Sequence, residues 1–258
     1  MTIFETARAG LPLEDVTVID VHAHYGSLIQ TYIPYNNADD IARNMKRVGV
    51  DRTCFCTMPY GGYGDQGLWN DRLIEAVKTH SDCFSGYVTL DGNRQDEVLG
   101  ELLRGEQAGL TMGIKMHTLR QHYRNTDRFL YPVYERVNSR RGWYLHHDFG
   151  TEAELEQLLR DFPDMIFIQG HPHTGYARLI RTYPNMYIST CAGIHFRIVE
   201  TLVKLFGADK ILLGSDSTIF DPSYGFGSVA FADISEADKR KILGENAKRL
   251  MDNIKLPE

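Results

Sequence analysis

Eight short segments rich in β-branched or aromatic residues alternate with stretches of helical periodicity along nearly the whole chain. The expected strands are VTVIDVHAH (from Val16), DRTCFCT (from Asp51), FSGYVTL (from Phe84), TMGIKMH (from Thr111), WYLHHDF (from Trp143), MIFIQGH (from Met165), NMYISTC (from Asn185) and KILLGSD (from Lys210). Between them, apolar residues recur three and four positions apart in stretches such as ADDIARNMKRV, EVLGELL and EAELEQLLRDF, which predicts helices. Repeated strand–helix units build a parallel sheet, and eight of them in 258 residues match the size of a closed barrel. The sequence therefore predicts an α/β fold, a (β/α)₈ TIM barrel with parallel strands and its active site at the C-terminal mouth, formed as a single domain over residues 1–258.

Three local signals mark expected helix ends. Thr151 with Glu154, and Ser235 with Asp238, have the spacing of capping boxes, in which side chains satisfy the free amides of a helix start. Gly207 is expected to close the helix before the last strand.

Composition excludes several classes of partner. The formal net charge is −6 and there is no basic tract, which argues against nucleic acid or an anionic membrane and favours a small-molecule substrate. The N-terminus lacks a signal-peptide pattern, and no segment reaches the roughly 18 apolar residues of a membrane helix. The four cysteines lack zinc-ribbon spacing and are too few for a disulfide scaffold, which predicts a cytoplasmic protein; they are Cys54, Cys56, Cys83 and Cys191.

Polar residues able to bind a metal gather at the C-terminal ends of the expected strands. They are His22 and His24 (first strand), Lys115 and His117 (fourth), His146, His147 and Asp148 (fifth), His171 (sixth) and Asp216 (eighth). In a (β/α)₈ barrel these ends converge on one mouth. Burying so many ionisable groups costs several kcal/mol each unless a metal or partner compensates them, so the conjunction predicts a metal site.

The His22-Ala23-His24 triplet is suited to gripping one ion. Side chains alternate along a strand, so the two histidines point to one side while Ala23 faces the helices. Imidazole suits zinc and similar divalent metals, and a carboxylate such as Asp216 would complete a site that keeps an open position for water.

The chain resembles the amidohydrolase-related group of metal-dependent hydrolases, which includes decarboxylases related to aminocarboxymuconate-semialdehyde decarboxylase. The resemblance is carried, in order, by VIDVHAHYG, GIKMH, FIQGHPHTG, ILLGSDS and KILGENAKRLM, and it covers nearly the entire chain. It implies that His22, His24 and His147 bind the metal and that His171 is the strand-six histidine. It also implies that Asp216 touches the metal and takes a proton from the bound water.

Two positions stay open in this assignment. A shift of one residue in strand five would make His146 or Asp148 the inward residue in place of His147. In strand six, His173 could share or alter the role of His171. Lys115 matches the position of a lysine that is carboxylated in some relatives with two metals, but that modification is not assigned.

Substrate contacts are expected from Lys115, His117 and the loops after strands one to four. The loop residues are Tyr25, Tyr60, Tyr63, Arg120, His122, Arg124 and Arg128, and the Gly-rich PYGGYGDQG segment is expected to form one of these loops. Arginine binds carboxylates in a bidentate way, which favours an acidic substrate. Cys54 and Cys56 share a face of strand two but lack a base partner in the sequence, so both are expected in the core. His80 and His195 are expected to be structural or on the surface.

The sequence favours a metal-dependent hydrolase that acts on a small amide, ester or lactone, with or without a carboxylate, through metal-activated water. In this reading His171 and Asp216 are catalytic. The alternative is a non-oxidative decarboxylase of the same superfamily, and a third reading is a non-catalytic metal-binding barrel. One divalent metal ion is expected, with zinc first and manganese, iron or cobalt as alternatives. The resemblance implies a homodimer.

Overall fold

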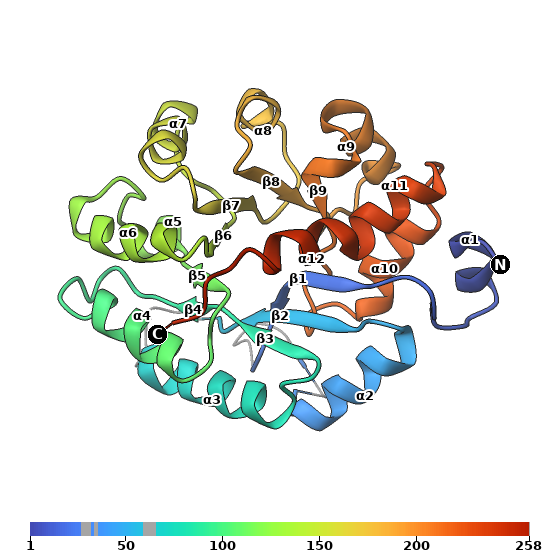
Figure 1. Ribbon diagram of the computed structural model, residues 1–258, viewed down its shortest axis with the longest axis horizontal. Coiled ribbons are helices and arrows are strands. Elements are labelled where there is room, and N and C mark those ends of the chain that lie inside the picture. The colour runs from blue at the N-terminus through green and yellow to red at the C-terminus, as the bar shows by residue number, and fades with distance from the viewer. Residues whose placement is uncertain (27–31, 34–35, 59–65, 258) are drawn as a thin grey trace.

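A ring of parallel strands lies inside a ring of helices in the computed structural model, which describes residues 1–26, 32–33, 36–58 and 66–257 (Figure 1). Its strands are β1 (Ile19–His24), β2 (Arg52–Cys56), β3 (Phe84–Gly86), β4 (Val88–Thr89), β5 (Gly113–Lys115), β6 (Trp143–His146), β7 (Ile166–Gln169), β8 (Met186–Ser189) and β9 (Ile211–Leu212). Its helices are α1 (Ile3–Arg8), α2 (Ala38–Val48), α3 (Gln66–Thr79), α4 (Val98–Gln107), α5 (Thr118–Gln121), α6 (Tyr131–Ser139), α7 (Glu152–Asp161), α8 (Ala177–Thr182), α9 (Ile198–Phe206), α10 (Pro222–Ala230), α11 (Glu236–Arg240) and α12 (Asn246–Met251). Short helical turns are η1 (Arg128–Leu130), η2 (Ala208–Lys210) and the π-helical η3 (Lys241–Glu245). Every segment expected to be a strand contains an observed strand, and FSGYVTL contains two, β3 and β4.

The strands pair in two parallel runs, β1-β2-β3 and β4-β5-β6-β7-β8-β9. At the first seam Tyr87 separates β3 from β4, yet its N–H donates to the Phe55 carbonyl of β2 at 2.9 Å. At the second seam, the Val21 N–H of β1 donates to the Leu213 carbonyl after β9, also at 2.9 Å. Backbone hydrogen bonds therefore cross both seams, as the predicted (β/α)₈ arrangement requires.

Two hydrophobic cores result from the alternation of side chains along the strands. The larger core lies between the strands and the surrounding helices. The smaller one fills the inside of the ring with residues such as Trp143, Leu145 and Ile168. Ala247 and Leu250 of α12 join this inner core, and α12 crosses the N-terminal end of the ring beside β1 and β9 (Figure 1). The opposite, C-terminal end carries the polar residues.

A shift in strand register sets the direction of the two histidines in β1. Ile19 and Val21 belong to the inner core, but the pairing with β2 is irregular between Asp20 and Ala23. Beyond that point the alternation is reversed, so Ala23 packs in the core on the helix side. The expected placement of Ala23 toward the helices is confirmed, and His22 lies fully buried at the mouth.

The expected helix ends are present with one difference. Thr151 and Glu154 form a complete capping box at the start of α7, and Gly207 ends α9 with φ 77°. Ser235 accepts from the Asp238 N–H at the start of α11, but the reciprocal bond is replaced by one between the two side chains. In the described part of the chain, no helix has both the length and the apolar character needed to span a membrane.

Candidate metal centre

His22 lies at the centre of the polar cluster at the mouth. Its Nδ1 is 3.3 Å from the Gly170 carbonyl oxygen, which can only accept, so Nδ1 carries the proton and Nε2 presents a lone pair. That Nε2 faces the Nε2 of His147 at 3.2 Å. Burial, and then the charge of Lys115, lower the pKa of both histidines well below the usual range, so both rings are neutral.

The approach of His22 to His147 fits a bound metal ion. The Lys115 Nζ lies 2.9 Å from the same Nε2 of His147 and donates to it, so the single lone pair of this nitrogen accepts from Lys115 when no metal is bound. A metal ion that binds both ring nitrogens would replace Lys115 as the partner of the His147 Nε2. Two nitrogens bound to one tetrahedral metal at about 2.0–2.1 Å are themselves about 3.3 Å apart, so the observed separation suits a shared ion.

Asp216 joins the remaining histidines. It follows β9 with a left-handed backbone of φ 61°, and its N–H donates to the His22 carbonyl at 2.9 Å. Its Oδ1 is 2.8 Å from the His24 Nε2 and 3.9 Å from the His22 Nε2. Burial alone would raise the pKa of Asp216, but the hydrogen bond from His24 and the charge of that imidazolium outweigh it and hold the pKa well below its usual range. The side chain is therefore a carboxylate, the form that binds metal.

His24 is oriented from both sides of its ring. Its Nδ1 lies 3.2 Å from the Cys56 Sγ, and this thiol lies 3.4 Å from the Ala23 carbonyl. Burial lowers the pKa of His24, but Cys56 and Asp216 outweigh burial and raise this pKa to about 9. A proton on Nε2 would have to leave before that atom could bind a metal.

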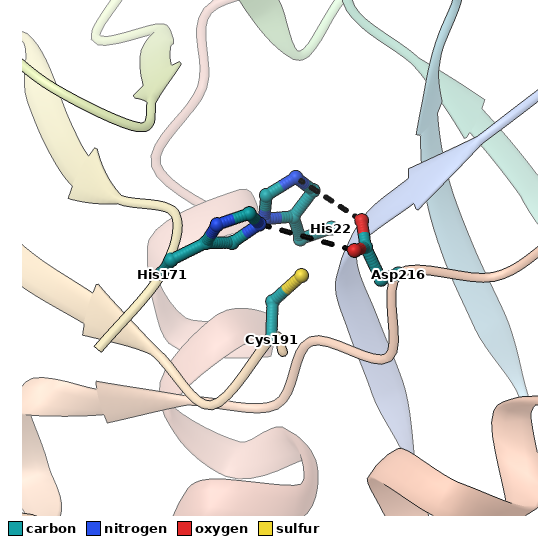
Figure 2. A group of neighbouring side chains, drawn as sticks. All are labelled: His22, His171, Cys191 and Asp216. Atoms are coloured by element: carbon teal, nitrogen blue, oxygen red, sulfur yellow. Dashed lines mark ion pairs between the residues drawn. The ribbon is translucent and has the colours of Figure 1, made fainter. Parts of the chain in front are cut away.

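His171 and Cys191 complete the cluster (Figure 2). The His171 Nε2 is buried, has no hydrogen-bond partner among the described residues, and lies 3.9 Å from the Asp216 Oδ2. Burial lowers the pKa of His171 to about 4. His22, His171, Cys191 and Asp216 each offer one ligand atom within 4.8 Å of the other three.

The sequence-predicted ligands and this compact group overlap only in part. His22 and Asp216 belong to both sets. His24 and His147 lie outside the compact group, although each is in contact with one of its members. The structure therefore brings all four predicted ligands to one place and adds His171 and Cys191.

The three candidates in strand five have different surroundings. His147 points into the cluster and stacks on His171, with ring centroids 4.0 Å apart. His146 points away: its Nδ1 accepts from the Asp148 N–H at 2.9 Å, and its Nε2 lies 3.3 Å from the Thr118 Oγ1. Asp148 accepts from the Tyr176 hydroxyl at 2.8 Å. Only His147 of the three contacts His22 among the described contacts.

The residues expected to contact substrate are spread more widely. Lys115 is fully buried beside His147, and the ring of His117 meets that of His147 edge-on at 4.8 Å. His173 is exposed, packs on Tyr176 and is not part of the compact group that includes His171.

The loop candidates lie farther out. Tyr25 packs on Phe55 at the edge of the core, and His122 is exposed at the end of α5. Arg124 forms an ion pair with Glu154 on the surface. The Arg128 guanidinium lies 4.7 Å from the centre of the Tyr131 ring. Arg120 belongs to α5 by its backbone, and its side chain lies outside what the structure describes, as do Tyr60, Tyr63 and most of the Gly-rich segment.

Sequence reasoning missed two thiols at this site. Cys56 was expected to lack a base partner, which is wrong, because it contacts His24; the expectation that Cys54 and Cys56 are buried is confirmed. Cys191 carried a usable signal, since it stands at the end of an expected strand like the histidines. His80 and His195 were expected to be structural or on the surface, and the structure agrees: His80 bonds to Asp39, and His195 is exposed.

A sequence model of the family described as Amidohydrolase matches residues 19–252. The chain belongs to the amidohydrolase family. The match begins with β1 and ends just after α12, so it includes the whole strand ring and every residue of the cluster. This amidohydrolase has no significant match among curated proteins.

Solved structures share the fold of this amidohydrolase at low sequence identity. An uncharacterised TIM-barrel protein from Bordetella bronchiseptica has a TM-score of 0.76 and 14% identity, covering 92% of this chain and 99% of its own. The 2,6-dihydroxybenzoate decarboxylase from Rhizobium has a TM-score of 0.73 and 16% identity, with the same coverage. A dihydroxybenzoic acid decarboxylase from Polaromonas sp. JS666, solved with bound manganese and 2-nitroresorcinol, has a TM-score of 0.74 and 16% identity, covering 92% of this chain and 97% of its own. These likenesses confirm the TIM-barrel fold.

Proposed function

We propose that this amidohydrolase is a metal-dependent decarboxylase that removes CO₂ from a small hydroxyaryl carboxylate. The observation that carries the proposal is the 3.2 Å approach of the His22 and His147 ring nitrogens, beside buried Lys115 and the Asp216 carboxylate. Support for decarboxylation over hydrolysis comes from the relatives of like fold, which include decarboxylases of dihydroxybenzoates.

His22, His24, His147 and Asp216 would hold the metal. When bound, a divalent cation supplies a Lewis acid that anchors and polarises substrate oxygens. The surrounding side chains decide which substrate binds and where protons move. A dipositive ion, one carboxylate and neutral imidazoles, together with the neighbouring Lys115 ammonium, give the site a net positive charge even when one more anionic side chain binds the metal, which favours an anionic substrate.

Lys115 would add to the attraction for a carboxylate. It is fully buried on β5, and its Nζ lies next to the predicted ligand His147. Burying an ammonium group without a counter-ion costs free energy. A substrate carboxylate that pairs with Lys115 would offset much of this cost, which strengthens its binding.

His171 and Asp216 would manage the proton. Loss of CO₂ breaks the bond from the ring to the carboxylate and leaves the electron pair on the ring carbon, which must then take up one proton. The His171 side chain is 38% exposed, while its Nε2 is buried 3.9 Å from Asp216. This ring therefore links solvent to the interior, and a proton can pass through it toward the carbon.

The test is CO₂ release by protein reconstituted with Mn²⁺ or Zn²⁺ and given 2,6-dihydroxybenzoate, 5-carboxyvanillate or unsubstituted benzoate. We expect CO₂ from a hydroxylated acid, one deuterium at the vacated carbon in D₂O, and no CO₂ from the His22→Ala/His24→Ala variant. Lys115→Met should raise KM for the acid at least tenfold, whereas Lys239→Met, which removes a buried lysine bonded to the Ala230 carbonyl away from the cluster, should not. Absence of CO₂ from every hydroxylated acid in the metal-loaded protein would argue against the proposal.

Hydrolysis of a small amide, ester or lactone is the second candidate. It is supported by Asp216, a carboxylate placed between His24 and His171 that can take a proton from an attacking water. A panel of these substrates should be run with the same preparations. Turnover there without any CO₂ from the acids would favour this candidate.

A further inference from the structure

Cys191 places a thiol inside the metal cluster. The residue follows β8, is fully buried, and its Sγ lies with the ligand atoms of His22, His171 and Asp216 in a group spanning no more than 4.8 Å. Figure 2 shows the sulfur pointing toward the space between His171 and Asp216. None of the expected roles uses this side chain.

The surrounding strands hold the thiol in this position. The Cys191 N–H donates to the Ser189 Oγ at 3.1 Å, which fixes the backbone just after β8. On the neighbouring strand, Gly214 leaves the space that both side chains need. A Cβ at this position would lie 2.9 Å from the Cys191 Cβ and 3.0 Å from the His22 Cβ. The glycine therefore lets the thiol and the central histidine share one face.

We propose that Cys191 is a metal ligand of this amidohydrolase and that its thiolate makes the site prefer Zn²⁺ or Co²⁺ to Mn²⁺. The inference rests on the metal site of the proposed function and names the metal class that it takes. Binding replaces the S–H bond by a metal–sulfur bond, and the proton goes to water. Thiolate is a soft ligand that suits zinc and cobalt, whereas manganese favours carboxylate and water oxygens.

The other three thiols give matched controls. Cys54 is also fully buried inside the ring, but it belongs to the inner hydrophobic core and not to the compact group. Cys83 lies on the outer side, next to His80 and Asp82. Cys56 contacts His24 from the far side of the ring from Asp216 and would act only through that histidine.

The experiment is cobalt substitution of the full-length protein, followed by absorption spectroscopy. A cobalt–thiolate bond gives a sulfur-to-metal charge-transfer band in the near ultraviolet, whereas nitrogen and oxygen ligands give none. We expect this band in wild type, in Cys54→Ala and in Cys56→Ala, and its loss in Cys191→Ala and Cys191→Ser. We also expect Cys191→Ala to lower the ratio of Zn²⁺ to Mn²⁺ affinity at least tenfold in competition with a chelator.

The outcomes separate this inference from the proposed function. Stoichiometric cobalt in wild type without the band, or a band that survives in Cys191→Ala, would overturn the thiolate ligand and leave the metal-dependent decarboxylase standing. No cobalt, zinc or manganese bound by wild type would overturn both. Because Cys83 is also near metal-capable groups, a band lost only in Cys83→Ala would assign the sulfur to the outer site and refute the proposal for Cys191.

Discussion

Gly170→Ala should disable the metal site while leaving the barrel folded. Gly170 lies just after β7, and its carbonyl oxygen accepts a hydrogen bond from the His22 Nδ1. A Cβ here would lie 2.7 Å from the His147 Cδ2 and 2.8 Å from the His22 Cε1. The added methyl group would therefore stand between the two rings whose nitrogens approach each other at 3.2 Å.

The size of the effect follows from these contacts. Carbon atoms pack best at about 3.5–4.0 Å, so each ring would have to retreat by about 1 Å. Misplacing reacting groups by about 1 Å costs on the order of 10²-fold in rate, and we expect metal affinity to fall by a similar factor. Overpacking of this kind costs about 1–3 kcal/mol of unfolding free energy, which a barrel of this size tolerates.

The assay is metal titration against a chelator, with thermal unfolding of the metal-free protein measured in parallel. Gly100→Ala is the matched control, because this exposed glycine of α4 has nothing within 4 Å of its added Cβ. It should stabilise the protein by about 0.4–1 kcal/mol and leave metal binding unchanged. If Gly170→Ala binds metal as tightly as wild type, the spacing of the His22 and His147 rings does not determine metal affinity.

Three further predictions concern other residues. Asp216→Asn should abolish turnover and keep the melting temperature of the metal-free protein within a few degrees, as measured by calorimetry; a fully active variant would contradict its role. Cys56→Ala should weaken metal binding about 10–100-fold in chelator competition, because it removes the outer contact that orients His24, and unchanged affinity would count against that contact. The backbone and side-chain bonds of Thr151, with Arg124 nearby, lower the pKa of Glu154 to about 2. The stabilisation from the Glu154 carboxylate is therefore complete above its unfolded pKa of about 4.5 and is lost as the pH falls toward 2. Glu154→Gln should cost about 1–2 kcal/mol of unfolding free energy at pH 7 and nothing near pH 2, as measured by urea unfolding. A cost that is independent of pH would exclude the ionised carboxylate as the source of this stabilisation.

The fold was predictable because its signals are local and repeated. Each expected strand contains an observed one, and the capping box of Thr151 and Glu154 forms as its spacing predicts. The position of the cluster followed from the same pattern, since parallel strands bring their C-terminal ends to one mouth. His22 and Asp216 needed only that topology to meet.

Finer features of the site depend on contacts between strands that the sequence does not encode locally. Periodicity could not choose between His146 and His147, because their direction depends on where the inward face of β6 ends. Cys56 meets His24 across two paired strands, and Cys191 meets His22 through the gap at Gly214. Such contacts require the register of neighbouring strands, which a single sequence does not supply.

The C-terminal segment ties one end of the barrel shut. After α12, the Lys255 N–H donates to the Arg140 carbonyl at 2.8 Å, and the Arg140 Nε donates to the Lys255 carbonyl at 2.9 Å. Together with Ala247 and Leu250, this clasp seals the floor of the ring with contacts that share no residue with the metal cluster. Substitutions at the mouth therefore leave these stabilising contacts intact. A library of variants confined to the mouth loops should accordingly keep the barrel folded while the substrate changes.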